Sequence, residues 1–123
     1  MGVTRIRRGD VYVAHFAAFP HEEGGPGKER PVVVVQNDED KENPTYPLVI
    51  VVPVSTQKVD RVYKQDVLLP KGSGGLSADS KALVGIVRTV QKADLVRRLG
   101  RLPKVRLEEI NLKLLRQMGF LER

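Results

Sequence analysis

Hydrophobic and polar residues follow strand-like patterns through the first half of the chain. Residues 11–16 alternate with a period of two after the Gly9-Asp10 turn, which predicts a first β-strand. Residues 31–36 are apolar on both faces, so we expect a central strand with neighbours on either side. Residues 48–54 are rich in β-branched side chains and predict a third strand, broken near its end by Pro53.

The pattern continues with shorter apolar segments, and the polar stretches between them predict loops. Residues 62–69 and 83–90 predict a fourth and a fifth strand, separated by a glycine-rich turn at residues 71–75. Residues 19–29 and 37–47 are rich in Gly, Pro or acidic side chains and predict loops. Strands at this spacing, without helices between them, predict an antiparallel sheet curled into a small barrel.

The last twenty residues have a different period. Pro103 precedes a segment in which apolar residues recur at steps of three and four, with charged residues between them: Leu107, Ile110, Leu114 and Met118. This spacing predicts an amphipathic α-helix that begins near Pro103 and ends at Gly119. We expect its apolar stripe to pack against the barrel.

Length and composition narrow the class of protein. A chain of 123 residues with 41% hydrophobic and 29% charged residues fits one compact domain, which we expect to span residues 1–123. The absence of cysteine excludes disulfides and thiolate metal sites. The N-terminus does not resemble a signal peptide, and the apolar runs are too short to span a bilayer. We therefore expect a cytoplasmic protein without membrane association.

Charge is divided unevenly along the chain. The net charge is +6, and it is the sum of −2 for residues 1–60 and +8 for residues 61–123. A basic half on a small domain suits a polyanion such as a nucleic acid, or an acidic protein. A solvated basic surface with no partner explains the charge equally well.

Candidate chemistry lies at the ends of the predicted strands. The sequence has only two histidines and no clustered carboxylates, so we predict no metal site. It also lacks the motif of a phosphate-binding loop, and we expect no cofactor. If the second and third strands form an antiparallel hairpin, Arg30 faces Ser55 and Thr56 at one sheet edge. The alternative is that Arg30 pairs with a loop carboxylate while the hydroxyls close a turn.

Several motifs together resemble the MazF/PemK family of toxin endoribonucleases, in the same order and over nearly the whole chain. The most specific is Arg-Pro, a valine run and Gln-Asn-Asp at residues 30–38. The others are Gly-Asp-Val-Tyr at residues 9–12, Glu-Glu-Gly-Gly at 22–25, Val-Val-Pro-Val-Ser-Thr at 51–56, Gly-Leu-Ser-Ala-Asp-Ser at 75–80, Val-Arg-Thr-Val at 87–90 and Leu-Gly-Arg-Leu at 99–102.

The resemblance implies a mainly β fold, a small SH3-like antiparallel β-barrel with a C-terminal amphipathic α-helix. It also implies a homodimer, an acidic antitoxin that holds the toxin inactive, and DNA binding by the toxin–antitoxin complex. The implied reaction is metal-independent cleavage of single-stranded RNA with some sequence preference. The ribose 2′-hydroxyl attacks the adjacent phosphorus and leaves a 2′,3′-cyclic phosphate and a 5′-hydroxyl.

The matching positions suggest roles for individual residues. Arg30 matches the family's catalytic arginine, and a planar guanidinium can grip two phosphate oxygens. Ser55 matches the catalytic threonine, and Thr56 is the hydroxyl after it. The remaining candidates are possible bases or substrate contacts: His21, Glu22 and Arg88.

The chain departs from the family pattern at three places. Gly85-Ile86 replaces an acid-Gln pair that some members use in the site, residues 22–30 form a longer loop, and Ser55 replaces threonine. The lost carboxylate keeps open a catalytically weakened descendant that only binds RNA. A further alternative is a CcdB-like inhibitor of a topoisomerase (gyrase), although such an inhibitor does not need the Arg-Pro and Val-Ser-Thr motifs.

Overall fold

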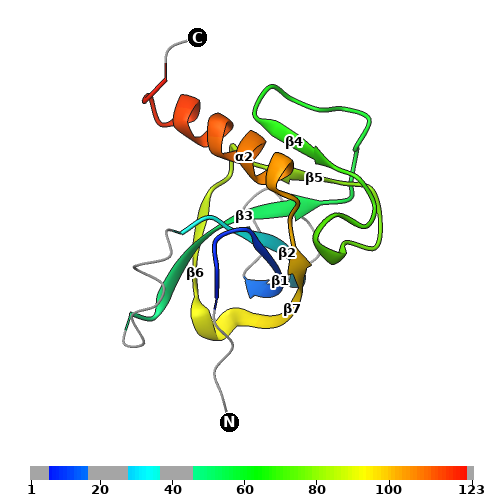
Figure 1. Cartoon of the computed structure of the whole chain (residues 1–123). Helices are drawn as coiled ribbons and strands as arrows, with labels where there is room; N and C mark the ends of the chain where they lie inside the picture. Colours follow the sequence, from blue (N-terminus) through cyan, green and yellow to red (C-terminus); the bar gives the residue numbers. More distant parts are fainter. Residues whose placement is uncertain (1–5, 17–27, 37–45, 122–123) are drawn as a thin grey trace.

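A computed structural model describes residues 6–16, 28–36 and 46–121 as an antiparallel sheet of seven strands with a helix after the last strand (Figure 1). The elements run in the order β1 (Asp10–Phe16), β2 (Lys28–Val34), β3 (Leu48–Ser55), β4 (Asp66–Leu69), β5 (Ser80–Leu83), β6 (Arg88–Gln91), β7 (Leu95–Arg101) and α2 (Lys104–Gln117). Two short 3₁₀ turns, η1 (Ser73–Gly75) and η2 (Lys92–Asp94), precede β5 and β7.

Strand β3 organises the sheet because it pairs with three other strands. One of its edges pairs with β2, and the other pairs first with β6, along residues 48–51, and then with β5 at residues 54–55. The single fifth strand predicted for residues 83–90 is therefore wrong. The chain turns between β5 and β6, where the Ile86 N–H donates to the Leu83 carbonyl oxygen at 2.9 Å. Pro53 does not break β3, because it lies between the two segments that pair along that edge.

The central strands are buried on both faces, which confirms the prediction for the second strand. Alternate residues of β1, β2 and β3 point into two separate cores. The upper core lies under α2, β4 and β5 and includes Val11, Val33, Val35, Val52, Val54 and Ile110. The lower core lies toward β6 and β7 and includes Tyr12, Ala14, Val32, Val34, Val49, Val51 and Val90 (Figure 1).

The predicted fold class is confirmed, with one refinement. The sheet runs β4-β5-β3-β2-β1-β7, with β6 added to β3, and η2 leads directly from β6 into β7. Within the described ranges no ladder joins β6 to β7, so the sheet is barrel-like and not closed. No helix in the described part of the chain is long and apolar enough to cross a membrane.

Strand β7 was not predicted, because its arginines interrupt any hydrophobic alternation. It is attached to β1 through Asp10, a carboxylate that is only 1% exposed. The Oδ1 atom of Asp10 lies 3.2 Å from an Arg98 guanidinium nitrogen and 3.3 Å from one of Arg101. The Oδ2 atom accepts a hydrogen bond from the Arg7 N–H at 2.9 Å. Tertiary ion pairs thus recruit a polar segment into the sheet.

The C-terminal helix forms where it was predicted, and most of its apolar stripe packs as expected. Ile110 is fully buried and Leu114 packs against the upper core. Met118 is an exception, since it is 66% exposed at the C-cap, and Gly119 with φ +88° then ends the helix. The last predicted stripe position therefore lies past the region that the sheet covers.

Two strand boundaries differ from the prediction because side chains form turns that the pattern does not reveal. The fourth strand starts at Asp66 and not at residue 62, since the Asp66 carboxylate accepts the Tyr63 N–H at 2.9 Å and closes a turn. The second strand starts at Lys28, inside the segment predicted as a loop, because residues 28–30 pair with β1.

Candidate functional site

The antiparallel ladder between β2 and β3 runs toward two of the predicted site residues, Arg30 and Ser55. The ladder pairs Val34 with Val51, Val33 with Val52 and Val32 with Pro53. Continued by two residues on each strand past its last pair, this register would set Arg30 opposite Ser55, and both are strand residues. Directly opposite residues in an antiparallel pair have Cβ atoms about 4.5–5.5 Å apart.

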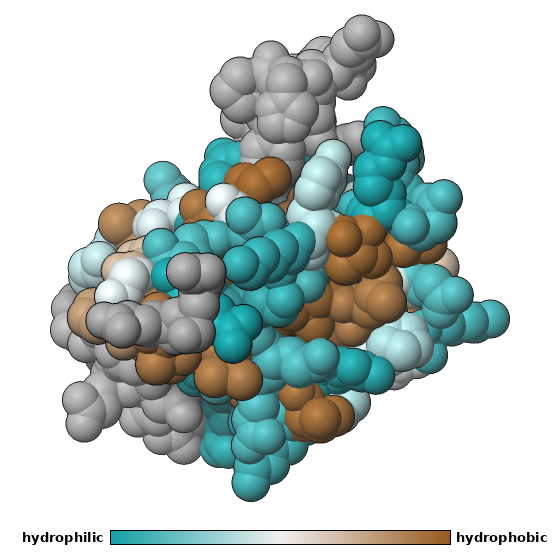
Figure 2. Space-filling view, turned by 90° about the horizontal axis from the view of Figure 1, so that it is seen from above, coloured by the Kyte–Doolittle hydropathy of each residue, from teal (hydrophilic) through white to brown (hydrophobic). Residues whose placement is uncertain are grey.

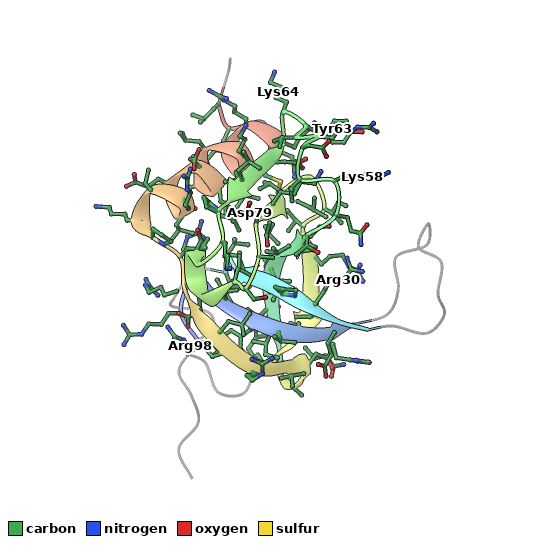
Figure 3. All side chains as sticks on the ribbon, turned by 90° about the vertical axis from the view of Figure 1, so that its right-hand side faces the viewer. Arg30, Lys58, Tyr63, Lys64, Asp79 and Arg98 are labelled. Atoms are coloured by element: carbon green, nitrogen blue, oxygen red, sulfur yellow. The ribbon has the colours of Figure 1, made fainter. Side chains whose placement is uncertain are left out.

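The side chains of this pair belong to the same face of the sheet. Residues two or four apart in a strand point to the same face, so Arg30 lies on the face of Val32 and Ser55 on the face of Val51. Both valines lie in the lower core. Both polar residues are half-buried at the rim of that core, and Arg30 projects from the end of β2 in Figure 3. The Ser55 Oγ accepts a hydrogen bond from the Gln57 N–H at 3.0 Å, so its oxygen is held where the chain leaves β3.

Thr56 and Arg88 are placed differently from this pair. Thr56 is exposed and follows the last residue of β3, so strand alternation no longer sets its direction. Arg88 pairs with Val51 on the face of the lower core, four residues along β3 from Ser55. At about 3.3 Å per residue, their positions are roughly 13 Å apart along the strand. Arg88 therefore lies apart from Ser55 along the sheet.

The other sequence candidates and departures have separate positions. His21 and Glu22 lie outside the described residues. The two positions where the acid-Gln pair is missing are described, and Ile86 packs against the lower core. A Cβ atom at Gly85 would lie 3.6 Å from the Gln65 Cβ and 3.8 Å from the Gln117 Oε1, so this position lies beside the C-terminal half of α2.

Sequence reasoning missed a buried ammonium next to Ser55. Lys81 pairs with Ser55 across the β3–β5 ladder, and its side chain is only 7% exposed. Its Nζ lies 3.6 Å from the Asp66 carboxylate, which is equally buried, and donates to the carbonyl oxygens of Lys58 at 3.1 Å and Arg61 at 2.6 Å. The one available signal was a lysine inside the short apolar segment before residue 84.

Tyr12, on β1, adds a second buried polar group; it pairs with Val32, two residues from Arg30. Its hydroxyl is buried with no hydrogen-bond partner among the described residues. Burial raises the pKa of the Tyr12 hydroxyl above its ordinary value of 10.0, the charge of Asp10 raises it further, and Arg98 opposes both. Tyr12 therefore keeps its proton through the neutral range.

Within the described ranges, no group of three histidine or acidic side chains is arranged to hold a metal ion. The chemistry that the continued β2–β3 register would offer is that of a cation, Arg30, across from a hydroxyl, Ser55. Such a pair can bind a phosphate through charge-assisted hydrogen bonds.

Comparison with known proteins identifies relatives across nearly the whole chain. A model of the PemK-like, MazF-like toxins of type II toxin-antitoxin systems matches residues 7–118. A probable endoribonuclease MazF from Mycolicibacterium smegmatis is 31% identical over 115 residues, which are 94% of this chain and 98% of that protein.

Solved structures share the fold at lower identity. An endoribonuclease from mycobacterial species, in complex with its cognate antitoxin, superposes with a TM-score of 0.75 at 19% identity and covers 96% of this chain and 99% of that one. A MazE–MazF complex from Deinococcus radiodurans gives a TM-score of 0.74 at 22% identity, with 97% and 100% covered. The match over residues 7–118 and the mycobacterial sequence relative show that this chain belongs to the PemK-like, MazF-like family of toxins of type II toxin-antitoxin systems.

Proposed function

We propose that this toxin is a metal-independent endoribonuclease, in which Arg30 and Ser55 hold the scissile phosphate of a single-stranded RNA. The observation that supports the proposal is the register of β2 and β3, because continuing it by two residues would set the Arg30 guanidinium opposite the Ser55 hydroxyl on one face of the sheet. Family membership and the relative named as a probable endoribonuclease support the same activity.

The reaction that fits this pair is an internal transfer at phosphorus. The 2′-oxygen loses its proton and bonds to the adjacent phosphorus, while the bond to the 5′-oxygen breaks and that oxygen takes up a proton. The products are a 2′,3′-cyclic phosphate and a 5′-hydroxyl end. No oxidant, reductant or second substrate is required.

Each residue has one proposed role in this transfer. The Arg30 guanidinium binds two non-bridging oxygens and stabilises the negative charge that grows in the transition state. The Ser55 hydroxyl donates to one of the same oxygens, and Thr56 is the second hydroxyl available at the end of β3. His21 and Glu22 are the proposed candidates for the base that takes the 2′-hydroxyl proton, and Arg88 is a proposed contact to another part of the RNA.

The test is incubation of the purified protein with single-stranded RNA in the presence of a chelator. We expect fragments whose 5′ ends are labelled by polynucleotide kinase without prior phosphatase treatment. Loss of a preorganised contact of this kind costs about 10²–10³ in rate, so Arg30→Ala and Ser55→Ala should each fall by at least that factor. Arg30→Lys keeps the charge but not the planar fork, and should recover only part of the loss.

The same experiment distinguishes the alternatives. RNA that is bound but remains intact at high protein concentration would indicate a descendant that has lost catalysis. Inhibition of a topoisomerase, with no effect on RNA, would indicate a CcdB-like activity. Cleavage that persists unchanged in Arg30→Ala would contradict the proposed site.

We also propose that the toxin acts in the cytoplasm and is held inactive by an acidic antitoxin. Two solved relatives are complexes with an antitoxin, and the net charge of +8 over residues 61–123 suits an acidic partner. If a small acidic protein is encoded next to this gene, its co-expression should abolish RNA cleavage and yield a stable complex on gel filtration.

A homodimer is the proposed state of the free toxin. Large hydrophobic side chains are exposed on α2 and just after it: Val105, Leu112, Leu115, Met118, Phe120 and Leu121. Figure 2 shows hydrophobic patches between hydrophilic residues on the face seen from above the view of Figure 1. Exposed apolar patches of this kind commonly mark protein interfaces. Light scattering should give twice the monomer mass, and Leu115→Glu should lower it.

A further inference from the structure

We propose that Lys58 and Arg61 form a second phosphate-binding site for the RNA strand, and that the buried Lys81 is a positioning residue that holds this site beside Ser55. The inference rests on the proposed function, since it takes RNA as the substrate. It assigns a role to a loop and to a buried ion pair that the Arg30–Ser55 pair does not explain.

The backbone of this loop is folded inward onto Lys81. A lysine ammonium has three donor hydrogens, and three acceptors surround this one: the carbonyl oxygens of Lys58 and Arg61, and the Asp66 carboxylate. The Arg61 N–H also donates to the Lys58 carbonyl oxygen at 2.9 Å, which closes a turn between the two residues. The ammonium lies 5.8 Å from the centroid of the Tyr63 ring, within reach of a cation–π contact.

Because the carbonyl groups point inward, the cationic side chains of the turn are left at the surface. Lys58 and Arg61 are both exposed, and neither forms an ion pair with any residue that the structure describes. Lys58 has φ +51°, a left-handed conformation that costs a non-glycine residue roughly 1 kcal/mol or more. The two bonds from Lys81 help to hold the backbone in this unfavourable shape.

The turn lies close to the proposed catalytic pair. Lys58 is three residues from Ser55, so their Cα atoms are at most about 11 Å apart. The hydrogen bond from the Gln57 N–H to the Ser55 Oγ bends the chain between them. In Figure 3, Lys58 and Arg30 project toward the same side of the molecule. An RNA backbone at Arg30 can therefore extend past Lys58 and Arg61.

The buried pair itself supports a positioning role. Removing two charges from water is costly, and a buried ion pair can often be replaced by apolar residues with no loss of stability. Lys81 lies in β5 between Ser80 and Ala82, and its ladder partners are Ser55 and Leu68. A hydrophobic residue would serve packing at least as well, whereas only a multiple donor can bind the two loop carbonyl groups.

The first test measures how RNA binding depends on salt. A fluorescent 2′-O-methyl oligonucleotide of mixed sequence serves as the probe, because it has no 2′-hydroxyl to attack and cannot be cut. Each phosphate contact contributes about 0.7 to the slope of log K against log salt for single strands. The double variant Lys58→Gln/Arg61→Gln should therefore lower the slope by about 1.4 and weaken binding roughly tenfold at 0.15 M salt.

The matched control removes the same charge elsewhere. Lys71 and Arg97 are exposed and take no part in the proposed site, so Lys71→Gln/Arg97→Gln should leave the slope unchanged. An equal change in both double variants would mean that only net charge matters, and would overturn the proposal. No RNA binding by the unmodified protein would instead count against the proposed function itself.

A second pair of substitutions tests the role of Lys81. Lys81→Met with Asp66→Asn removes both buried charges, and the Asn oxygen can still accept the Tyr63 N–H. This variant should melt close to the unmodified protein, yet bind RNA about tenfold more weakly, as Lys58→Gln/Arg61→Gln does. In both variants the KM for RNA cleavage should rise, with little change in kcat. When Lys58→Gln/Arg61→Gln is added to Lys81→Met/Asp66→Asn, the slope of log K against log salt should change little more.

Two results would contradict this account. One is full additivity of the two sets of substitutions, which would show that Lys81 acts independently of the turn. The other is normal RNA binding by Lys58→Gln/Arg61→Gln together with lost binding of a polyglutamate peptide, which would assign this surface to an acidic protein.

Discussion

Replacing the buried carboxylate of Asp10 tests how the last strand is attached to the sheet. In Asp10→Asn the side chain keeps its size, and its oxygen can still accept the Arg7 N–H. The substitution removes the negative charge that faces Arg98 and Arg101 at 3.2 Å and 3.3 Å. Packing is therefore preserved while the ionic contacts between β1 and β7 are lost.

The expected loss follows from the exposure of the partners. A hydrogen bond to a charged group contributes about 1.5–3 kcal/mol, and an exposed ion pair about 0–1 kcal/mol. The arginine side chains are 44% and 50% exposed, so solvent screens both contacts and the lower part of each range applies. We expect Asp10→Asn to lower the free energy of unfolding by about 2 kcal/mol, or roughly 8 °C in Tm for a domain of this size.

Urea denaturation and differential scanning calorimetry measure this loss, with Asp60→Asn as the control, since Asp60 is exposed. The control should change stability by less than about 0.5 kcal/mol. A double-mutant cycle with Arg98→Met should give a coupling energy of at least about 0.5 kcal/mol. If Asp10→Asn has the same Tm as Asp60→Asn, the Asp10 carboxylate does not hold β7, and hydrophobic contacts alone attach that strand.

Three further substitutions test single features of the fold. Tyr12→Phe removes a buried hydroxyl that has no partner among the described residues, so stability at pH 7 should stay the same or rise. The pKa of Tyr12 is raised above 10.0, so its contribution is present below pH 10 and is lost as the pH rises further and the unfolded chain ionises. Between pH 9 and 11, the free energy of unfolding should therefore fall more for the unmodified protein than for Tyr12→Phe, as measured by denaturation at each pH. Gly75→Ala should cost at least about 2 kcal/mol, because φ is +83° and the new Cβ would lie 2.2 Å from the Leu99 carbonyl oxygen. Gly85→Ala should raise stability by about 0.5 kcal/mol in the same thermal assay, because its nearest contact would be an ordinary 3.6 Å; a loss there would mean that this turn is strained.

The sequence alone predicted those elements that pack along their whole length against one neighbouring part of the structure, because such packing gives a regular hydrophobic period. Strands β1 and β3 follow their β-branched and alternating patterns, and α2 follows steps of three and four. The central place of β2 was predictable too, because a run that is apolar on both faces must be covered on both, whereas its pairing with β3 stood only as a condition. The proposed opposition of Arg30 and Ser55 depends on continuing that pairing by two residues.

Tertiary structure decided the features that depend on contacts between distant segments. The split of residues 83–90 into β5 and β6 arises because β3 pairs with two strands along one edge, and no local pattern records that need. Strand β7 forms because Asp10 binds arginines about ninety residues away, although its own sequence shows no strand period. In the same way, Lys81 becomes a buried group with three acceptors only when the loop that follows Ser55 folds over β5. The hydrophobic period of a segment indicates which of its faces is exposed to solvent. Buried charges and shared strand edges depend instead on which segments contact one another in the folded protein.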